Sequence, residues 1–257
     1  MKLEDWLRQN ENSVDWNVFS TPWDAMQLKH NPFRNEQIQA ILDASEILNK
    51  NTPKVLDIGC GPGILGRKML EAKPSTRYVG IDGDPVVLEA MRHLLKGSGA
   101  TSILADFRRA EWTKKHLGQF DAVVSLTALH WLSQQHQKAA YRAAFDVLKP
   151  GGTLTIGDPY VPQGPDDRKI LEAIQQERMM SQTGQTWEEF WQRFFETYPI
   201  KDVYTAYHRE KGYQEPFEGS DDGYPLEFHL NALREAGFRT TAVYWKNGLR
   251  AVYGGKK

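Results

Sequence analysis

Residues 55–66, with the sequence VLDIGCGPGILG, constrain the fold more than any other part of the chain. A short apolar run is followed there by Gly59, Gly61 and Gly63, and then by a second apolar pattern with helical spacing. Glycines let the backbone turn sharply and approach a ligand without hindrance from a Cβ atom. The N–H groups that begin the next helix are free to bind polar groups. The segment predicts a strand, a ligand-binding loop and a helix, in that order.

The region that follows repeats this alternation of strand and helix. Helical patterns lie at about residues 64–72, 85–96 and 134–148. Between and around them, five short apolar runs are predicted buried strands: KVLDIG, RYVGID, SILADF, FDAVVSL and TLTIGD. Such a series of βαβ units predicts an α/β fold, a Rossmann-like, doubly wound and mostly parallel sheet with helices on both faces.

The chain divides into four predicted segments. Residues 1–52 are a helical N-terminal arm or lid, and residues 53–158 are the ligand-binding core. Residues 159–225 are too few for a core of their own, so they are a helical insertion and not a separate domain. We expect this insertion to act as a substrate lid. Residues 226–257 supply the last helix and an antiparallel hairpin, because Asn247-Gly248 is a strong hairpin signal.

Composition limits the class of protein, its expected cellular location and its expected partners. The chain has 257 residues, a formal net charge of −1 and a single cysteine, so we expect neither a disulfide nor a metal cluster. No apolar run is long enough for a transmembrane helix, and the polar N-terminus predicts a cytoplasmic protein. Basic residues are scattered among acids, so we expect no nucleic-acid partner and no membrane partner. The sequence leaves the oligomeric state open.

The glycine loop by itself is compatible with two ligands. Residues 61–66 also match the dinucleotide pattern GxGxxG, and Asp82 stands where that pattern places its ribose-binding acid. Two other acids favour a different ligand. Asp57 directly precedes the glycines and would repel a pyrophosphate, whereas S-adenosylmethionine (SAM) has no phosphate and carries two positive charges. Asp106 ends the third predicted strand, where it can accept a hydrogen bond from an adenine amino group.

With these motifs the chain resembles the class I SAM-dependent methyltransferase family. The segments VLDIGCGPG, IDGDP, LADF and FDAVVSLTALHWL stand in the order and spacing of that family, and LKPGGTLTIGDP and the closing hairpin continue it. The resemblance implies SAM as cofactor, with the glycine loop at its methionine part and an acid on the ribose. The residues expected to bind it are Asp57, Gly59, Cys60, Gly61, Gly63, Asp82, Gly83, Asp106, Phe107, Leu126 and Thr127.

The acceptor is expected beyond the fourth and fifth strands, because ligands of such sheets bind at the carboxyl ends of the strands. His130 is the predicted catalytic residue, with a structural histidine as the alternative. The predicted substrate contacts are Trp16, Trp23, Trp131 and Tyr160. The segment SLTALHWLSQ is similar to one found in small-molecule carboxyl methyltransferases. Trp187, Phe190, Trp191 and Phe194 form a helical stripe that serves either as core or as the underside of a lid.

The predicted function is methyl transfer from SAM to a small molecule, with an oxygen, including a carboxylate oxygen, as the favoured acceptor atom. Two alternatives stay open at this point. One is an NAD(P)-dependent oxidoreductase, based on the GxGxxG pattern. The other is a protein that binds SAM or S-adenosylhomocysteine (SAH) without catalysis, since binding residues alone do not demonstrate turnover.

Overall fold

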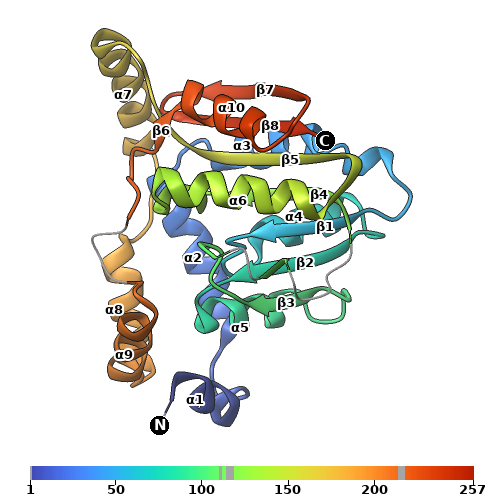
Figure 1. The fold of residues 1–257 in the computed structure, drawn as a ribbon. Helices are drawn as coiled ribbons and strands as arrows, with labels where there is room; N and C mark the ends of the chain where they lie inside the picture. The colour runs from blue at the N-terminus through green and yellow to red at the C-terminus, as the bar shows by residue number, and fades with distance from the viewer. Residues whose placement is uncertain (1, 110–111, 114–118, 214–217) are drawn as a thin grey trace.

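The computed structural model describes residues 2–109, 112–113, 119–213 and 218–257 (Figure 1). Parts of the predicted core (110–111 and 114–118) and of the predicted insertion (214–217) lie outside the described residues. None of the helices in the described ranges is long and apolar enough to span a membrane. The elements are α1 Leu3–Asn10, α2 Trp16–His30, α3 Arg34–Ala44, η1 Ile47–Asn49, β1 Lys54–Ile58, α4 Ile64–Ala72, β2 Arg77–Asp82, α5 Pro85–Leu94, β3 Thr101–Leu104, β4 Phe120–Leu126, η3 Leu129–Trp131, α6 Gln134–Val147, β5 Leu148–Val161, α7 Pro165–Met180, α8 Trp187–Thr197, α9 Lys201–Lys211, β6 Tyr224–Pro225, α10 Leu226–Glu235, β7 Thr240–Asn247 and β8 Arg250–Lys256.

The central sheet has the strand order β3-β2-β1-β4-β5-β8-β7, and the short β6 pairs with β5. Strands β1 to β5 run parallel, whereas β8 is antiparallel to both β5 and β7. This confirms the predicted doubly wound, mostly parallel sheet with a closing antiparallel hairpin. The order reverses between β1 and β4, and in open α/β sheets the ligand crevice lies at the carboxyl ends of the strands beside such a reversal.

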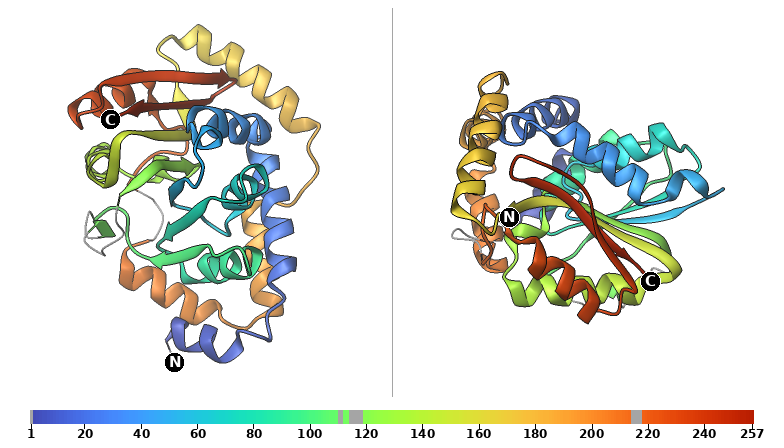
Figure 2. Two further views of the ribbon diagram at one scale, coloured as in Figure 1. Left: turned by 90° about the vertical axis from the view of Figure 1, so that its right-hand side faces the viewer. Right: turned by 90° about the horizontal axis from the view of Figure 1, so that it is seen from above.

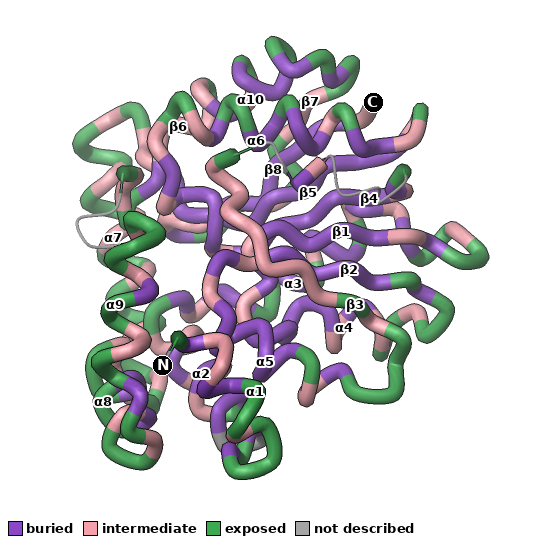
Figure 3. Tube along the Cα trace, turned by 60° about the horizontal axis from the view of Figure 1, so that its bottom comes forward, coloured by how far each residue is buried: buried purple, intermediate pink, exposed green. Residues whose placement is uncertain are grey.

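Alternation along the strands divides the core between the two faces of the sheet. Val55 and Ala122 pack with apolar side chains of α3, α4 and α5 on one face. Leu56 and Val123 pack with α6 and α10 on the other. Figure 3 shows the strands as a buried centre between partly exposed helices. Side chains point to opposite faces with a period of two, so a strand covered on both faces is apolar throughout, as the sequence predicted.

The N-terminal arm and the insertion form one packed unit rather than two separate lids. Rings from α2 and α8 are buried together, and Phe19 lies with its ring centroid 5.0 Å from Phe190, 5.9 Å from Trp191 and 5.1 Å from Phe194. Figures 1 and 2 show α8 and α9 beside α2, at the side of the sheet where the parallel strands end. We call this group of rings from α2 and α8 the aromatic cluster. Its stripe on α8 is therefore core, although Trp187 and Trp191 also line the cavity described below.

Three local features differ from the sequence-based expectation. The sequence predicts a helical arm to residue 52, but the last α-helix of the arm ends at Ala44, because Glu46 adopts a left-handed φ of 57° before η1 begins. The third strand ends at Leu104, so Asp106 lies in the loop beyond it. The charged stretch after residue 200, for which no helix was predicted, forms α9. That helix buries Tyr207 against the aromatic cluster. Tertiary packing outweighs a weak local pattern in such a segment.

Candidate functional site: a cavity at the carboxyl edge of the sheet

A cavity of about 600 Å³ opens at the carboxyl ends of β1, β2 and β4. Helices α2, α3, α7, α8 and α9 contribute its other walls. The volume falls within the roughly 300–1,000 Å³ typical of small-molecule sites. Eleven of the sixteen site residues predicted from the sequence line it: Trp23, Asp57, Gly59, Cys60, Gly61, Asp82, Phe107, Leu126, Thr127, His130 and Trp131.

The glycine loop approaches the neighbouring chain too closely for side chains. Gly59 has a φ of 71°, and an ideal Cβ on it would lie 2.3 Å from the Cβ of Ala128. Gly63 has a φ of 84° and caps the N-terminus of α4. Only glycine adopts such angles without strain. The sequence pattern thus corresponds to a steric requirement, and the loop presents bare backbone to the cavity.

Asp82 ends β2 and is held in place by the backbone around it. Its carboxylate accepts hydrogen bonds from the N–H of Gly61 at 2.9 Å and from the N–H of Asp84 at 3.0 Å. Burial raises the pKa of Asp82 to about 6, against the lowering effect of these N–H donors. The carboxylate therefore links the glycine loop to the β2–α5 turn and borders the cavity.

Asp57 is a buried acid with an unused oxygen. It is 1% exposed, and the hydroxyl of Tyr78 donates to its Oδ2 at 2.5 Å. Its Oδ1 has no hydrogen-bond partner among the described residues. Burial raises the pKa of Asp57 to about 7, although the bond from Tyr78 acts in the opposite direction. A cation at this end of the cavity would neutralise the Asp57 carboxylate and donate to its free oxygen. The residues here therefore fit a positively charged ligand such as SAM.

Asp106, the predicted adenine contact, forms an ion pair with Arg108 in the structure. The guanidinium of Arg108 donates to both carboxylate oxygens, at distances between 2.7 and 3.1 Å, and these bonds lower the pKa of Asp106. Arg108 also donates to the carbonyls of Lys211 and Gly212 at the end of α9. Asp106 is not among the residues that line the cavity, whereas Phe107 is. The adenine role of Asp106 stays a prediction.

Thr127 follows β4 in a strained conformation at the cavity wall. Its φ is 52°, which is uncommon for a β-branched residue. The N–H of Thr127 donates to the carbonyl of Gly157 at 2.7 Å, and its Oγ1 accepts from Nη1 of Arg34 at 3.3 Å. Arg34 is 5% exposed and pairs with Asp24 at 3.3 Å. Such strain is often found at functional sites.

His130 is paired with a buried carboxylate that the sequence analysis did not single out. Nδ1 of His130 lies 2.8 Å from Oδ1 of Asp158, and the two residues are 8% and 1% exposed. A carboxylate only accepts hydrogen bonds, so the proton of this contact belongs to Nδ1. Nε2 is then the ring nitrogen available to a ligand in the cavity. Trp131 packs at 4.7 Å from the His130 ring.

The remaining predicted site residues lie elsewhere. Trp16 is buried in the aromatic cluster and stacks on His93, 5.5 Å away between ring centroids. Gly63 and Gly83 are not among the cavity-lining residues, and the Gly83 carbonyl accepts from Tyr207 of α9. Tyr160 lines a small side pocket, and its hydroxyl donates to the carbonyl of Gly248.

Several cavity residues were missed from the sequence. They are Arg34, Gln175, Tyr204, His208, Arg250 and, behind His130, Asp158. Asp158 carried a usable signal, because it ends a buried strand next to the predicted acceptor. The others are polar residues on amphipathic helices or at a hairpin, and nothing local separates them from ordinary surface residues.

The fold and site together define the class. A seven-strand path with a closing hairpin, a glycine loop after β1 and acids at the carboxyl ends of β1 and β2 match the arrangement expected from the resemblance to class I SAM-dependent methyltransferases.

Comparison with known proteins agrees with this class. Residues 55–152 match the family model described as "Methyltransferase domain". A trans-aconitate 2-methyltransferase of Streptomyces avermitilis is 29% identical over 168 residues, which cover 64% of this chain and 61% of that protein. An uncharacterized methyltransferase of Mycobacterium tuberculosis is 33% identical over 135 residues, covering 52% of this chain and 59% of the relative. The chain thus spans about three fifths of the length of these relatives.

Solved structures share the fold. Human N-acetylserotonin methyltransferase in complex with SAM superposes with a TM-score of 0.56 at 16% identity, covering 93% of this chain and 57% of that one. An O-methyltransferase family protein from Burkholderia thailandensis gives a TM-score of 0.57, also at 16% identity, with 88% and 58% covered. Residues 55–152 of the chain thus match a methyltransferase domain, and the chain shares its fold with SAM-dependent methyltransferases.

Proposed function

We propose that the protein transfers a methyl group from SAM to an oxygen of a small acidic molecule, with a carboxylate as the leading acceptor. SAM, when bound, supplies a methyl group activated by a positively charged sulfur. The proposal rests on one observation, the charge arrangement of the cavity. Buried Asp57 and Asp82 line the cavity beside the glycine loop, and two arginines and three histidines also line it: Arg34, Arg250, His30, His130 and His208.

At the cofactor end, each group has a separate task. Asp57 offers its unpartnered oxygen to the ammonium of the methionine part. Asp82 accepts hydrogen bonds from the ribose hydroxyls. The glycine loop allows the methionine chain to lie against the backbone, because no side chain fits between them. Charge-assisted bonds of this kind are the stronger hydrogen bonds in proteins.

At the acceptor end, Arg34 and His130 are buried and pair with Asp24 and Asp158, whereas Arg250 forms no ion pair among the described residues. Glu188, Asp221 and Asp222 also line the cavity, but they are exposed. Water and salt screen the exposed acids far more than the buried cations. An anion is therefore favoured inside the cavity. The similarity to trans-aconitate 2-methyltransferases supports a carboxylate as that anion.

A carboxylate needs no base, since it titrates near pH 4 and is ionised at neutral pH. We assign His130 to binding and aligning it. In the imidazolium form, Nε2 donates to the acceptor oxygen, and buried Asp158 stabilises the positive charge through Nδ1. Trp131 covers the imidazole and keeps water from the reacting atoms.

A hydroxyl acceptor is the second candidate, favoured by the same histidine–aspartate pair. With Nδ1 protonated and held by Asp158, neutral His130 presents Nε2 as a proton acceptor. It would then remove the hydroxyl proton as the oxygen attacks the methyl group. General-base catalysis of this kind contributes roughly 10²–10⁴-fold in rate.

The pH dependence of methyl transfer separates these candidates, because they predict opposite slopes. With a carboxylate acceptor, the imidazolium form of His130 is the active one, so kcat/KM falls as pH rises. With a hydroxyl acceptor, it rises. In both cases His130→Gln and Asp158→Asn remove the slope, and His136→Gln on α6, outside the cavity, retains it. If neither carboxylic acids nor hydroxyl compounds become methylated while SAM binds, the proposal is wrong and the chain is a SAM-binding protein without this activity.

A further inference from the structure

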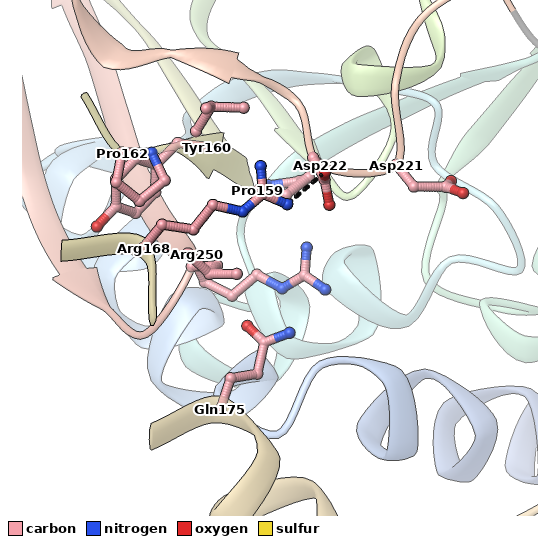
Figure 4. Close-up of a pocket in the computed structure, with 10 residues that line it drawn as sticks. Pro159, Tyr160, Pro162, Arg168, Gln175, Asp221, Asp222 and Arg250 are labelled. Atoms are coloured by element: carbon pink, nitrogen blue, oxygen red, sulfur yellow. Dashed lines mark hydrogen bonds and ion pairs between the residues drawn. The ribbon is translucent and has the colours of Figure 1, made fainter. Parts of the chain in front are cut away.

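We infer that Arg250 and Gln175 form a second anionic subsite, which binds an acidic group of the acceptor other than the one that is methylated. The inference rests on the proposed function and specifies its substrate class, molecules with at least two acidic groups. It is carried by an arginine with unused hydrogen-bonding capacity and by a side pocket, drawn in Figure 4, that shares lining residues with the main cavity.

Arg250 stands at the edge of the sheet where the cavity opens. It is the first residue of β8 and pairs with Pro159 of β5, next to Asp158. Its Nη2 donates to the carbonyl of His30 at 3.2 Å. Its buried Nε has no hydrogen-bond partner among the described residues. Asp158, Asp221 and Asp222 attract the charge of Arg250, but none of them forms an ion pair with it within 4.0 Å.

The two arginines of the cavity differ in what they offer a ligand. The guanidinium of Arg34 is already paired with Asp24 and bonded to Thr127. The guanidinium of Arg250 binds only a neutral carbonyl in the described part of the chain. A guanidinium has five N–H donors, and a buried N–H without a hydrogen-bond partner, such as that at Nε of Arg250, costs free energy. Arg250 is therefore the arginine that an incoming anion would neutralise.

The side pocket has room for an acidic group but not for a whole substrate. Its volume is about 30 Å³. A cavity needs roughly 10–15 Å³ on the same scale to hold one water molecule. Arg250, Gln175, Asp221 and Asp222 line both the side pocket and the main cavity, so the two spaces adjoin at these residues. A ligand in the cavity can thus place one end beside Arg250.

Gln175 on α7 supplies the second polar group of this subsite. Its buried Oε1 has no hydrogen-bond partner among the described residues. Because the oxygen and nitrogen of an amide are interchanged by a flip of the group, Gln175 can turn its NH₂ towards a carboxylate. Figure 4 shows Gln175 and Arg250 on facing walls of the pocket. Arg168 pairs with Asp222 at 2.8 Å and so offsets the negative charge nearest to the opening.

The group on Arg250 is not the one that reacts. A strong ion pair with a guanidinium withdraws electron density from a carboxylate and makes its oxygens poorer nucleophiles. The residues of the cavity at the methyl-transfer end, Thr127, His130 and Trp131, do not line the side pocket. The reactive carboxylate therefore lies at His130, and a second acid at Arg250 fixes the orientation of the molecule.

Three acids on one carbon chain test this subsite: trans-aconitate, trans-glutaconate and crotonate, with three, two and one carboxylates. A fourth probe, trans-4-aminobut-2-enoate, replaces the second carboxylate of glutaconate by an ammonium. We expect kcat/KM for glutaconate to exceed that for crotonate, and Arg250→Gln to reduce this ratio by roughly 10–100-fold. Arg250→Lys should restore part of the ratio, and Arg239→Gln, which changes an exposed arginine, should preserve it.

Binding of the four probes to the SAH-loaded protein provides a readout that does not depend on turnover. SAH affinity in Arg250→Gln confirms that the variant is folded. If the acids bind, and Arg250→Gln abolishes the preference for two carboxylates, the subsite stands even if none of them is methylated, and only the proposed function fails. An equal loss for glutaconate and crotonate, a preference for the ammonium probe, or no binding of any acid overturns the subsite.

Discussion

The two halves of the cavity are built in different ways. The cofactor half comes from short segments that follow consecutive strands, residues 57–61 and 82–84, and its contacts join residues that are near in sequence, such as Asp82 and Gly61 at a separation of 21. The acceptor half combines α2, α3, η3, α7 and the start of β8. There, Arg250 bonds to His30 across 220 residues. Loop geometry determines the first half, and long-range packing determines the second.

This difference concerns stability as well as function. The arm and the insertion are joined through the aromatic cluster, and that cluster also packs on Val86 and Val87 of α5. Removing the arm would therefore expose apolar surface of the insertion and of the core together. We therefore expect substitutions inside the cluster to destabilise the whole fold and not the acceptor half alone.

The largest expected effect is on the free energy of unfolding, through a substitution in the aromatic cluster. Phe19 is buried among rings of α2 and α8, and Phe19→Ala should lower the free energy of unfolding by about 3–5 kcal/mol. Met180→Ala, at a position that is 89% exposed, should change it by less than about 0.5 kcal/mol. Urea denaturation measures both. A loss below about 1 kcal/mol for Phe19→Ala would contradict the view that the arm and insertion form one unit.

The next effect tests the cofactor half. Asp82→Ala removes a carboxylate proposed to accept two ribose hydroxyls, each bond contributing roughly 1.5–3 kcal/mol. SAH affinity, measured by calorimetry, should fall by at least about a hundredfold. Asp146→Ala, which removes a half-exposed acid of α6, should leave it unchanged. Equal affinities for the Asp82 variant and the wild type would show that ribose is held elsewhere.

A third prediction concerns the pH dependence of SAM binding through Asp57. Its pKa of about 7 is raised, so the free protein carries a protonated Asp57 below that pH. The cation binds the ionised form. SAM affinity should therefore be constant above pH 7 and fall about tenfold per pH unit below it, more steeply near pH 6, where Asp82 is also protonated. Asp57→Asn should bind SAM weakly and without the step near pH 7. A flat wild-type profile between pH 6 and 8 would contradict an ion pair at Asp57.

The smallest expected effect is on the dissociation rate of SAH, through a contact that links the loop after β3 to α9. Arg108 bonds Asp106 beside β3 to the carbonyls at the end of α9. Arg108→Gln should free α9 at this point and raise the dissociation rate of SAH by about fivefold, equivalent to one hydrogen bond of about 1 kcal/mol. Arg109→Gln is the matched control, because that side chain is 71% exposed and lies 3.8 Å from Asp106. Stopped-flow fluorescence measures both rates. Unchanged release in the Arg108 variant would separate α9 from the cofactor half.

The fold could be predicted almost entirely from local pattern. Five buried strands, the helices between them and the closing hairpin follow from hydrophobic runs bounded by glycine, proline and aspartate. The exception is α9, whose many charged residues obscure the buried face of the helix. The burial of α9 depends on a surface that other elements form, and the sequence of α9 alone does not indicate that surface.

By itself, the sequence determined the cofactor half, because a glycine that must adopt a positive φ and an acid at the end of a strand are local requirements. Only the tertiary structure decided which polar side chains meet. It places His130 beside Asp158, gives Arg250 no ion pair among the described residues, and buries Trp16 in the aromatic cluster, whereas Trp23 also lines the cavity. The physical reason is that the energy of a buried charge or ring depends on its partners, and those partners lie up to 220 residues away along the chain.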